Sequence, residues 1–151
     1  MNGHDQRQLP PSSAITAVGV DHVRLSYHYL DSGDLEGYGS LLDENMQMKR
    51  PDAPPGRGRA EVLRGQVAAN RSPLRHHIFK IVADGDSVVA MGHLTARADR
   101  RGEPAAGPSD CFPADPSEGL AFVDVFTLSD EGMLLGCRRF YYTAPGAPHP
   151  Q

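Results

Sequence analysis

The residue best suited to chemistry in this chain of 151 residues is an aspartate, Asp124, in an otherwise apolar segment. If Gly119–Leu128 forms a β-strand, alternate side chains share a face, and Asp124 then lies with Phe122 and Phe126. A carboxylate among aromatic rings loses its hydration, so it needs a cationic partner or a proton. The pattern therefore predicts either an acid with a raised pKa for general acid-base catalysis, or an aspartate held in a buried ion pair.

Two consecutive arginines in the last apolar segment are the candidate partners. In a strand, Arg138 and Arg139 point to opposite faces. Arg138 shares its alternation with Leu134 and Phe140, so we expect Arg138 to face inward. There it would pair with Asp124 or bind a substrate oxyanion. A surface or interface arginine is the alternative for both, and the favoured interpretation for Arg139.

Three histidines, His76, His77 and His93, form a second candidate group, because two of them facing each other across strands would share a proton transfer. The dipeptide Asp84-Gly85 between two apolar runs is typical of a β-hairpin turn, and a turn centred there places His76 opposite His93. A turn centred one residue later places Ile78 opposite His93 instead. Alternation leaves open whether His76 or His77 faces inward. Solvent-facing or structural histidines are the alternative for each.

Aromatic side chains elsewhere complete the candidate site. Tyr27 and Tyr38 lie on two expected helices, where each offers a ring to an apolar ligand and a hydroxyl to a carbonyl; core packing is the alternative. Phe112 lies near the centre of a loop rich in Gly and Pro, Asp99–Glu118, which we expect to flank the mouth of a cavity. The chain contains no HxH, HExxH or CxxC pattern and no glycine-rich phosphate loop, so we expect neither a metal nor a cofactor.

Helical spacing of apolar residues in the first half of the chain predicts three helices. The first begins at Ser12 or Ser13, Asp34 is a typical N-cap of the short second helix, and the third covers Ala60–Asn70. The expected inward stripe of the first helix is broad. It comprises Ile15, Val18, His22, Leu25 and Tyr29, with Val23, Tyr27 and Leu30 beside them.

A period of two in the second half predicts a four-strand antiparallel meander. Its strands are His76–Ala83, Ser87–Ala98, Gly119–Leu128 and Met133–Thr143. A brief strand around Met46 and Met48 and a loop over Pro51–Gly58 precede it. The fold class is therefore α+β, with three N-terminal helices packed on a curved, mostly antiparallel sheet. Residues 14–143 are expected to form this single domain between flexible tails over residues 1–13 and 144–151.

Several segments occur in an order that is specific when they are taken together. They are Tyr29–Leu35, Arg57–Leu63, Arg75–His77, Val82–Asp86, Phe122–Phe126 and Asp130–Gly132. This order resembles the SnoaL-like branch of the nuclear-transport-factor-two-like (ketosteroid-isomerase-like) superfamily. The resemblance implies a cone-shaped α+β barrel with one apolar cavity, no cofactor and a homodimeric assembly. It also implies that a carboxylate at the position of Asp124 acts as an acid or base.

Composition excludes some partners and suggests a cellular setting. A net charge of −4 disfavours nucleic-acid binding. No apolar run approaches the roughly 18 residues of a membrane helix. The polar N-terminus and the two cysteines favour a cytoplasmic protein. The excess of 13 Arg over 2 Lys suggests a GC-rich bacterial genome, which suits secondary metabolism.

We therefore expect a cofactor-free cyclase, isomerase or dehydratase that acts on a small apolar oxygenated, polyketide-like metabolite in natural-product biosynthesis. Asp124 would be the acid or base, a histidine pair the proton relay, and Arg138 with a tyrosine the carbonyl-binding group. A non-catalytic ligand-binding or assembly protein is one alternative. An epoxide hydrolase is another, and it needs a second acid bridged to Asp124 by an arginine. A cavity lined by both Asp124 and a histidine would favour the enzyme.

Overall fold

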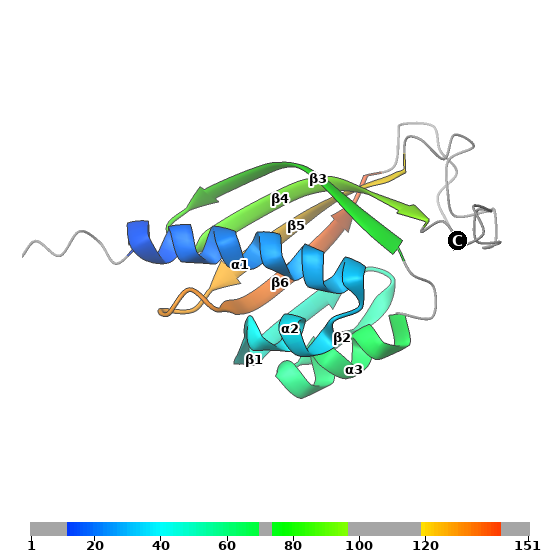
Figure 1. Cartoon of the computed structure of the whole chain (residues 1–151), viewed down its shortest axis with the longest axis horizontal. Helices are drawn as coiled ribbons and strands as arrows, with labels where there is room; N and C mark the ends of the chain where they lie inside the picture. Colours follow the sequence, from blue (N-terminus) through cyan, green and yellow to red (C-terminus); the bar gives the residue numbers. More distant parts are fainter. Residues whose placement is uncertain (1–11, 70–73, 97–118, 143–151) are drawn as a thin grey trace, which may run out of the picture.

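Three helices pack on the inner side of a curved six-stranded sheet in the computed structural model, which describes residues 12–69, 74–96 and 119–142 (Figure 1). The helices are α1 (Ser12–Ser32), α2 (Leu35–Ser40) and α3 (Arg59–Ala69). The strands are β1 (Leu42–Arg50), β2 (Ala53–Arg57), β3 (Leu74–Asp84), β4 (Ser87–Ala96), β5 (Leu120–Leu128) and β6 (Leu134–Tyr141).

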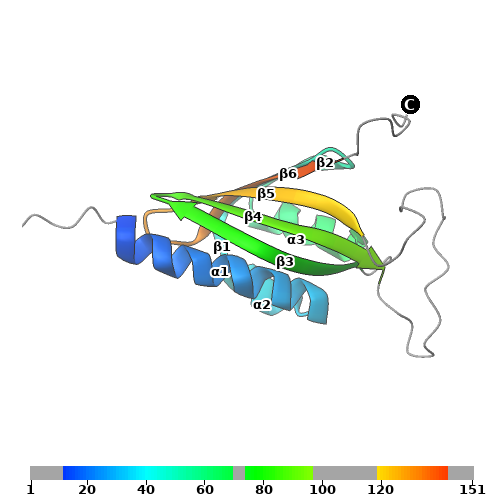
Figure 2. The same cartoon turned by 90° about the horizontal axis from the view of Figure 1, so that it is seen from above.

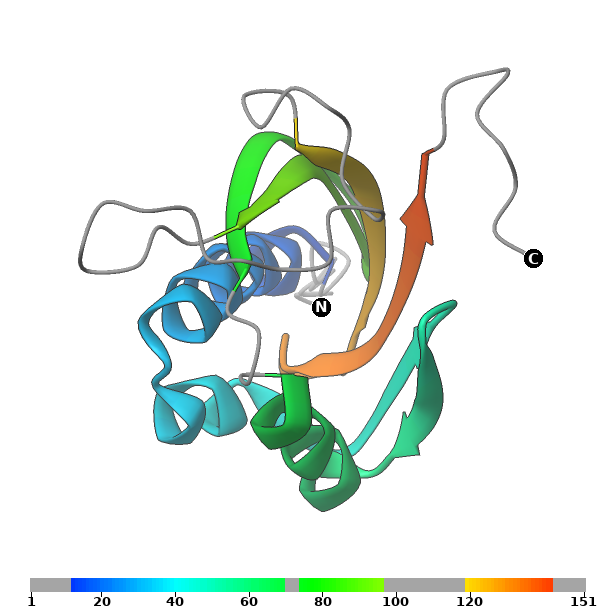
Figure 3. The ribbon, with the colours of Figure 1, turned by 90° about the vertical axis from the view of Figure 1, so that its right-hand side faces the viewer.

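The sheet has the strand order β2-β1-β6-β5-β4-β3. Neighbouring strands are antiparallel except β1 and β6, which are parallel. Figure 3 shows the sheet bending round the space in front of the helices, with its edge strands β2 and β3 apart, so the described sheet stays open. The predicted α+β class, with helices on a curved and mostly antiparallel sheet, is confirmed. The expected tails, except Ser12 and Ser13 in α1, and the loop with Phe112 lie outside the described residues.

Helix α1 buries one side of the broad stripe expected for it. Val23 and Tyr27 are buried as predicted, together with Ser26, whereas Val18 and Leu25 are 43% and 39% exposed. Gly19 explains the difference, because a Cβ atom on it would stand 2.1 Å from a methyl carbon of Leu128. The helix therefore lies against β5 at its smallest residue, and the predicted inward placement of Val18 and Leu25 is wrong.

Of the predictions for the short elements after α1, the cap of α2 is confirmed and the loop before α3 is wrong in part. The carboxylate of Asp34 accepts the Gly37 N–H at 2.8 Å, which confirms the N-cap of α2. Residues 53–57, expected to lie in a loop, instead form β2, which is antiparallel to β1. Two consecutive prolines, Pro54 and Pro55, are tolerated there because β2 is an edge strand of the sheet.

A β-bulge in the β3–β4 hairpin determines which histidines face each other. Asp84 pairs with Ser87, so the turn lies one residue later than Asp84-Gly85. Phe79 is then left unpaired between Ile78 and Lys80, and this extra residue shifts the register again, as a bulge does. His77 therefore lies opposite His93. Both predicted pairings, His76 with His93 and Ile78 with His93, are wrong.

A second irregularity, between β5 and β6, reverses the expected orientation of the arginines. Gly136 pairs with Thr127 but Leu134 pairs with Leu128, which leaves Leu135 as an extra residue. Alternation beyond this point is reversed, because one inserted residue turns every following side chain to the other face. Arg139 is buried and Arg138 is exposed. The prediction that Arg138 faces inward is therefore wrong.

Candidate functional site

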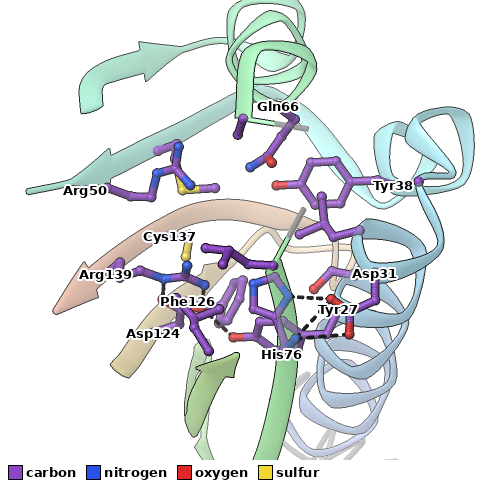
Figure 4. A pocket seen from close by; sticks show the side chains of 17 residues that line it. Tyr27, Asp31, Tyr38, Arg50, Gln66, His76, Asp124, Phe126, Cys137 and Arg139 are labelled. Carbon is purple, nitrogen blue, oxygen red and sulfur yellow. Dashed lines mark hydrogen bonds and ion pairs between the residues drawn. The ribbon is translucent and has the colours of Figure 1, made fainter. Parts of the chain in front are cut away.

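A cavity of about 300 Å³ lies between the sheet and the helices (Figure 4). Every helix and the strands β1, β3, β4, β5 and β6 contribute side chains to its lining. The polar members are Ser26, Tyr27, Asp31, Tyr38, Arg50, Gln66, His76, Asp124 and Arg139. Figure 4 shows two groups of them joined by hydrogen bonds, one around Asp124 and one around His76.

The first group is a buried ion pair between neighbouring strands. Arg139 donates from Nε to Oδ1 of Asp124 and from Nη2 to Oδ2, both at 2.8 Å. Asp124 is 1% exposed and Arg139 is 8% exposed. The two residues are register partners on β5 and β6, so the backbone holds them in place for this two-point contact. The pair compensates a carboxylate that would otherwise be costly to bury.

Arg139 is held by the carboxylate of Asp124 and by the ring of Phe122. Its Cζ lies 4.4 Å from the centre of the Phe122 ring, in a cation–π contact. Burial by itself would lower the pKa of Arg139, but the hydrogen bonds and the charge of Asp124 raise it above its ordinary value. The guanidinium therefore stays charged. Two of its five N–H groups bind Asp124, the Tyr141 hydroxyl is within hydrogen-bonding reach of the guanidinium, and Arg139 also lines the cavity.

Tyr27 links this ion pair to α1. Its hydroxyl donates to Oδ2 of Asp124 at 2.6 Å, and its ring meets the rings of Phe122 and Phe126. Burial raises the pKa of Tyr27, and the negative charge of Asp124 raises it further. Tyr27 therefore keeps its proton as a hydrogen-bond donor. With Arg139, it supplies Asp124 with three hydrogen bonds in all.

The second group joins α1 to β3. Nδ1 of His76 lies 2.6 Å from Oδ1 of Asp31. The backbone N–H of His76 donates to both carboxylate oxygens of Asp31, at 3.1 and 3.2 Å. The ring packs 5.1 Å from that of Tyr27, centre to centre. Nε2 of His76 has no hydrogen-bond partner among residues 12–69, 74–96 and 119–142, and His76 lines the cavity. This arrangement suits a histidine that exchanges a proton with a bound molecule.

Sequence reasoning missed Asp31, although one signal for it exists. Asp31 lies in the last turn of α1, where the helix dipole disfavours a negative charge. An aspartate at such a position indicates that another group stabilises its negative charge, and here that group is His76. The sequence alone does not say which residue that partner is, because the two are 45 positions apart.

The other two histidines lie on the outer face of the sheet. His77 is exposed, and its Nε2 lies 2.9 Å from Oγ1 of Thr95. The ring of His93 packs 5.3 Å from that of Phe79, centre to centre. Nδ1 of His93 is buried without a hydrogen-bond partner in the described part of the chain. Neither histidine lines the cavity, so the structure brings only His76 to Asp124.

Some of the predicted substrate-binding residues line the cavity and others do not. Tyr27, Tyr38 and Phe126 line the cavity. Phe122 lies behind the lining, where its ring contacts those of Tyr27 and His76. The predicted placement of Arg138 is wrong, because its guanidinium lies outside, 5.5 Å from the centre of the Phe140 ring.

Two kinds of feature are not found in the described residues. Residues 12–69, 74–96 and 119–142 contain no group of three His, Cys, Asp or Glu side chains placed to hold a metal ion. Over the same ranges, no helix has the length and apolar character needed to cross a membrane.

The model of the SnoaL-like domain family matches residues 23–134, most of the described fold. No curated protein sequence matches the chain.

Many solved structures share the fold. A candidate ketosteroid isomerase from Kribbella flavida aligns with a TM-score of 0.66 at 20% identity, over 89% of this chain and 85% of its own. A candidate polyketide cyclase from Sinorhizobium meliloti aligns with a TM-score of 0.62 at 16% identity, over 80% and 94%. TerC, co-crystallised with polyporic acid, aligns with a TM-score of 0.61 at 18% identity, over 83% and 92%. At these identities the likeness establishes the fold.

Proposed function

The chain belongs to the SnoaL-like domain family, and from that premise we propose that it is a cofactor-independent enzyme of acid-base chemistry. Its substrate is a small, apolar, oxygenated metabolite, and its reaction is a cyclisation, isomerisation or dehydration. The observation that carries this proposal is a cavity lined by both Asp124 and the Asp31-bound His76. A volume of about 300 Å³ is at the lower end of the range for sites that bind small molecules.

His76 is the proton-transfer group in this proposal. Asp31 holds Nδ1, so the lone pair of Nε2 is available to accept a proton from a carbon or hydroxyl of the substrate. A general base oriented by a carboxylate through its other nitrogen follows the logic of the Ser-His-Asp triad, here without the serine. Since both oxygens of Asp124 already accept hydrogen bonds, the geometry favours His76 over Asp124 for this step.

Arg139 is the group that stabilises developing negative charge. Removing a proton next to a carbonyl places negative charge on the carbonyl oxygen, and a fixed guanidinium in a buried site stabilises that charge. Asp124 and Phe122 hold Arg139 in one orientation, so little reorganisation is needed during the reaction. Asp124 thereby acts as a positioning residue for Arg139, and Tyr27 supports it from α1.

A non-catalytic binding protein with the same ligand class is the second candidate. The complete hydrogen bonding of Asp124, at 1% exposure, favours it, because such an aspartate is not free to exchange protons. An epoxide hydrolase is not supported. Arg139 holds Asp124, but the other acid in the cavity lining, Asp31, binds His76 and makes no hydrogen bond or ion pair with Arg139 in the part of the chain that the structure describes.

The cellular setting extends the proposal. The neighbours named as a polyketide cyclase and a ketosteroid isomerase support a polyketide-like substrate in bacterial natural-product biosynthesis. A location in the cytoplasm is part of the proposal and rests on the low cysteine content of the chain. We also propose a homodimer formed through the outer face of the sheet, which the described helices leave uncovered (Figure 2). Phe79, Val82 and Phe140 are 64%, 47% and 47% exposed there, which is costly for large apolar side chains without a partner.

Turnover of polyketide-like intermediates tests this function. Wild-type protein is incubated with a panel of such compounds, and products are followed by mass spectrometry. His76→Gln is expected to lower kcat by about 10²–10⁴-fold, the usual contribution of a general base. His77→Gln, a neighbouring histidine on the outer face, is the matched control and keeps full activity. Equal turnover by wild type and His76→Gln contradicts the role of His76, and binding without turnover supports the non-catalytic candidate.

A further inference from the structure

Three polar side chains in the cavity have no partner among the residues that the structure describes. The Tyr38 hydroxyl, the Gln66 amide and the Arg50 guanidinium make no hydrogen bond or ion pair with any residue in the described ranges. Tyr38 is 2% exposed and Gln66 is 8% exposed, and both line the cavity, so the small accessible part of each side chain faces that cavity. Polar side chains in a protein interior are normally hydrogen-bonded, and three polar ends left open in one cavity are available to a ligand.

These three groups lie together, away from the ion pair. They come from α2, α3 and β1, and Figure 4 shows their ends pointing toward one another on the side of the cavity away from Asp124. Electrostatics agrees with this placement. Burial raises the pKa of Tyr38, while the charge of Arg50 partly opposes the rise, as a nearby cation does. Tyr38 therefore remains a proton donor.

Arg50 is a charge of the cavity that no acid in residues 12–69, 74–96 and 119–142 pairs with. The charge of Arg139 is balanced by Asp124, and Asp31 is bound to His76. Of the acids near Arg50, Asp52 accepts a hydrogen bond from the Tyr141 hydroxyl at 3.2 Å instead. A half-buried guanidinium without a carboxylate is costly, and an anionic ligand removes that cost.

A second hollow provides room beyond this cluster. It has a volume of about 640 Å³ and lies between β1, β2 and α3. It shares lining residues with the first cavity, among them Arg50, Gln66 and Arg139. Glu61 and Arg64 on α3 add charges of opposite sign to its wall. The cluster therefore lies where the two spaces join. A ligand too long for the first cavity would contact the cluster there and extend into the second hollow.

We propose that Arg50, Gln66 and Tyr38 form a subsite for a carboxylate group of the substrate. A planar guanidinium donates two parallel hydrogen bonds to a carboxylate, and the amide and the phenol supply further donors. One unpaired cation with two neutral donors matches a group of one negative charge, whereas a phosphate ester carries up to two. The substrate would therefore be an apolar acid whose carboxylate is held at this end while His76 faces its reacting atoms. The inference rests on the proposed function in taking this cavity as the substrate site.

Binding of matched aromatic probes tests the subsite without any turnover. 2-Naphthoate, the neutral 2-naphthamide and 2-naphthyl phosphate are titrated into the full-length protein by calorimetry. Wild type is expected to bind the carboxylate about tenfold or more tightly than the amide, since tenfold corresponds to about 1.4 kcal/mol. Arg50→Met is expected to reduce this preference to about twofold, and Arg50→Lys to an intermediate value because lysine lacks the two-point geometry.

Controls make each outcome decisive. Arg138→Met removes an exposed arginine outside the cavity and keeps the preference. Tyr38→Phe and Gln66→Leu weaken it less than Arg50→Met, and they test the subsite if the Arg50 variants do not fold. No binding of naphthoate, equal binding of acid and amide, stronger binding of the phosphate, or an unchanged preference in Arg50→Met overturns the proposal.

The two proposals fail separately. His76→Gln is expected to lower kcat by about 10²–10⁴-fold and to keep the preference for the carboxylate. If the preference holds in wild type but no compound is turned over, the subsite stands and the enzymatic function fails. If His76→Gln rather than Arg50→Met removes the preference, the anion binds at His76 and the subsite is wrong.

Discussion

His76 is held by Asp31 through both its ring and its backbone. Nδ1 of the ring lies 2.6 Å from the carboxylate, and the backbone N–H donates to the same group at 3.1 and 3.2 Å. The backbone contact anchors the carboxylate whatever the protonation state of the ring. The carboxylate in turn fixes the ring, so that one nitrogen is occupied and the other is available to the cavity.

Neutral His76 is expected to carry its proton on Nδ1, the nitrogen that faces Asp31. Nitrogen-15 NMR of histidine-labelled protein distinguishes the two tautomers directly. Asp31→Ala should convert the ring to the Nε2–H form and lower kcat by about 10-fold or more with little change in KM, because orientation is lost but ligand contacts remain. Asp21→Ala, an exposed acid on the same helix, is the control. A wild-type spectrum that shows the Nε2–H tautomer contradicts the assignment.

The buried Arg139 and the exposed Arg138 allow a matched comparison of how each arginine contributes to the free energy of unfolding. Arg139→Met leaves Asp124 as a buried, uncompensated carboxylate, which typically costs about 3–5 kcal/mol in the free energy of unfolding. Arg138→Met removes an exposed side chain and should change it by less than about 0.5 kcal/mol. Urea denaturation measures both variants. Equal effects would mean that the ion pair does not compensate the burial of Asp124.

Much of the fold was predictable because local signals agree with one another. Asp34 satisfies an N–H at the start of α2, and such a cap is readable from residue type alone. Strand β2 was missed because Pro54 and Pro55 argue against a strand, and only the position at the sheet edge makes them acceptable. The inward placement of Val18 and Leu25 on α1 was wrong because the decisive residue, Gly19, has no side chain to count as apolar.

The candidate site was predictable only in part, because two single-residue irregularities decide which side chains face inward. Asp124 was found because it stands on a regular strand, where a period of two holds. The extra residues Phe79 and Leu135 break that period on β3 and β6. They separate His76 from the other histidines and put Arg139 in the place expected for Arg138. Bulges depend on pairing with a neighbouring strand, so one strand's own sequence does not reveal them.

Phe79 and Phe140 test the proposed dimer. In a homodimer joined through the outer sheet face, Phe79→Glu places a charge in the interface and should yield a monomer in light scattering. Phe140→Glu should act similarly. Val67→Glu, at a residue 58% exposed on α3, is the control and should leave the assembly unchanged. A wild-type protein that is monomeric at micromolar concentration contradicts the dimer, as does a Phe79→Glu variant that still dimerises.

Three buried acidic groups should make the protein less stable in alkali. Burial raises the pKa values of Tyr27, Tyr38 and Cys137, so the folded protein keeps protons that the unfolded chain releases. That release begins near the ordinary values, 9.0 for the thiol and 10.0 for the phenols. Their contribution to stability is thus fully present below about pH 9 and falls above it, by up to about 1.4 kcal/mol per pH unit for each group.

Tyr38→Phe isolates one of these groups. Without the phenol, the free energy of unfolding should fall less steeply above pH 10, by about 1.4 kcal/mol per pH unit, because one proton fewer is released on unfolding. Urea denaturation between pH 8 and pH 11 measures the two slopes. Tyr142→Phe, at a residue 62% exposed, serves as the control and should keep the wild-type slope. If Tyr38→Phe also keeps it, the folded protein does not hold the Tyr38 proton more tightly than the unfolded chain, and Tyr38 loses its role as a fixed donor beside Arg50.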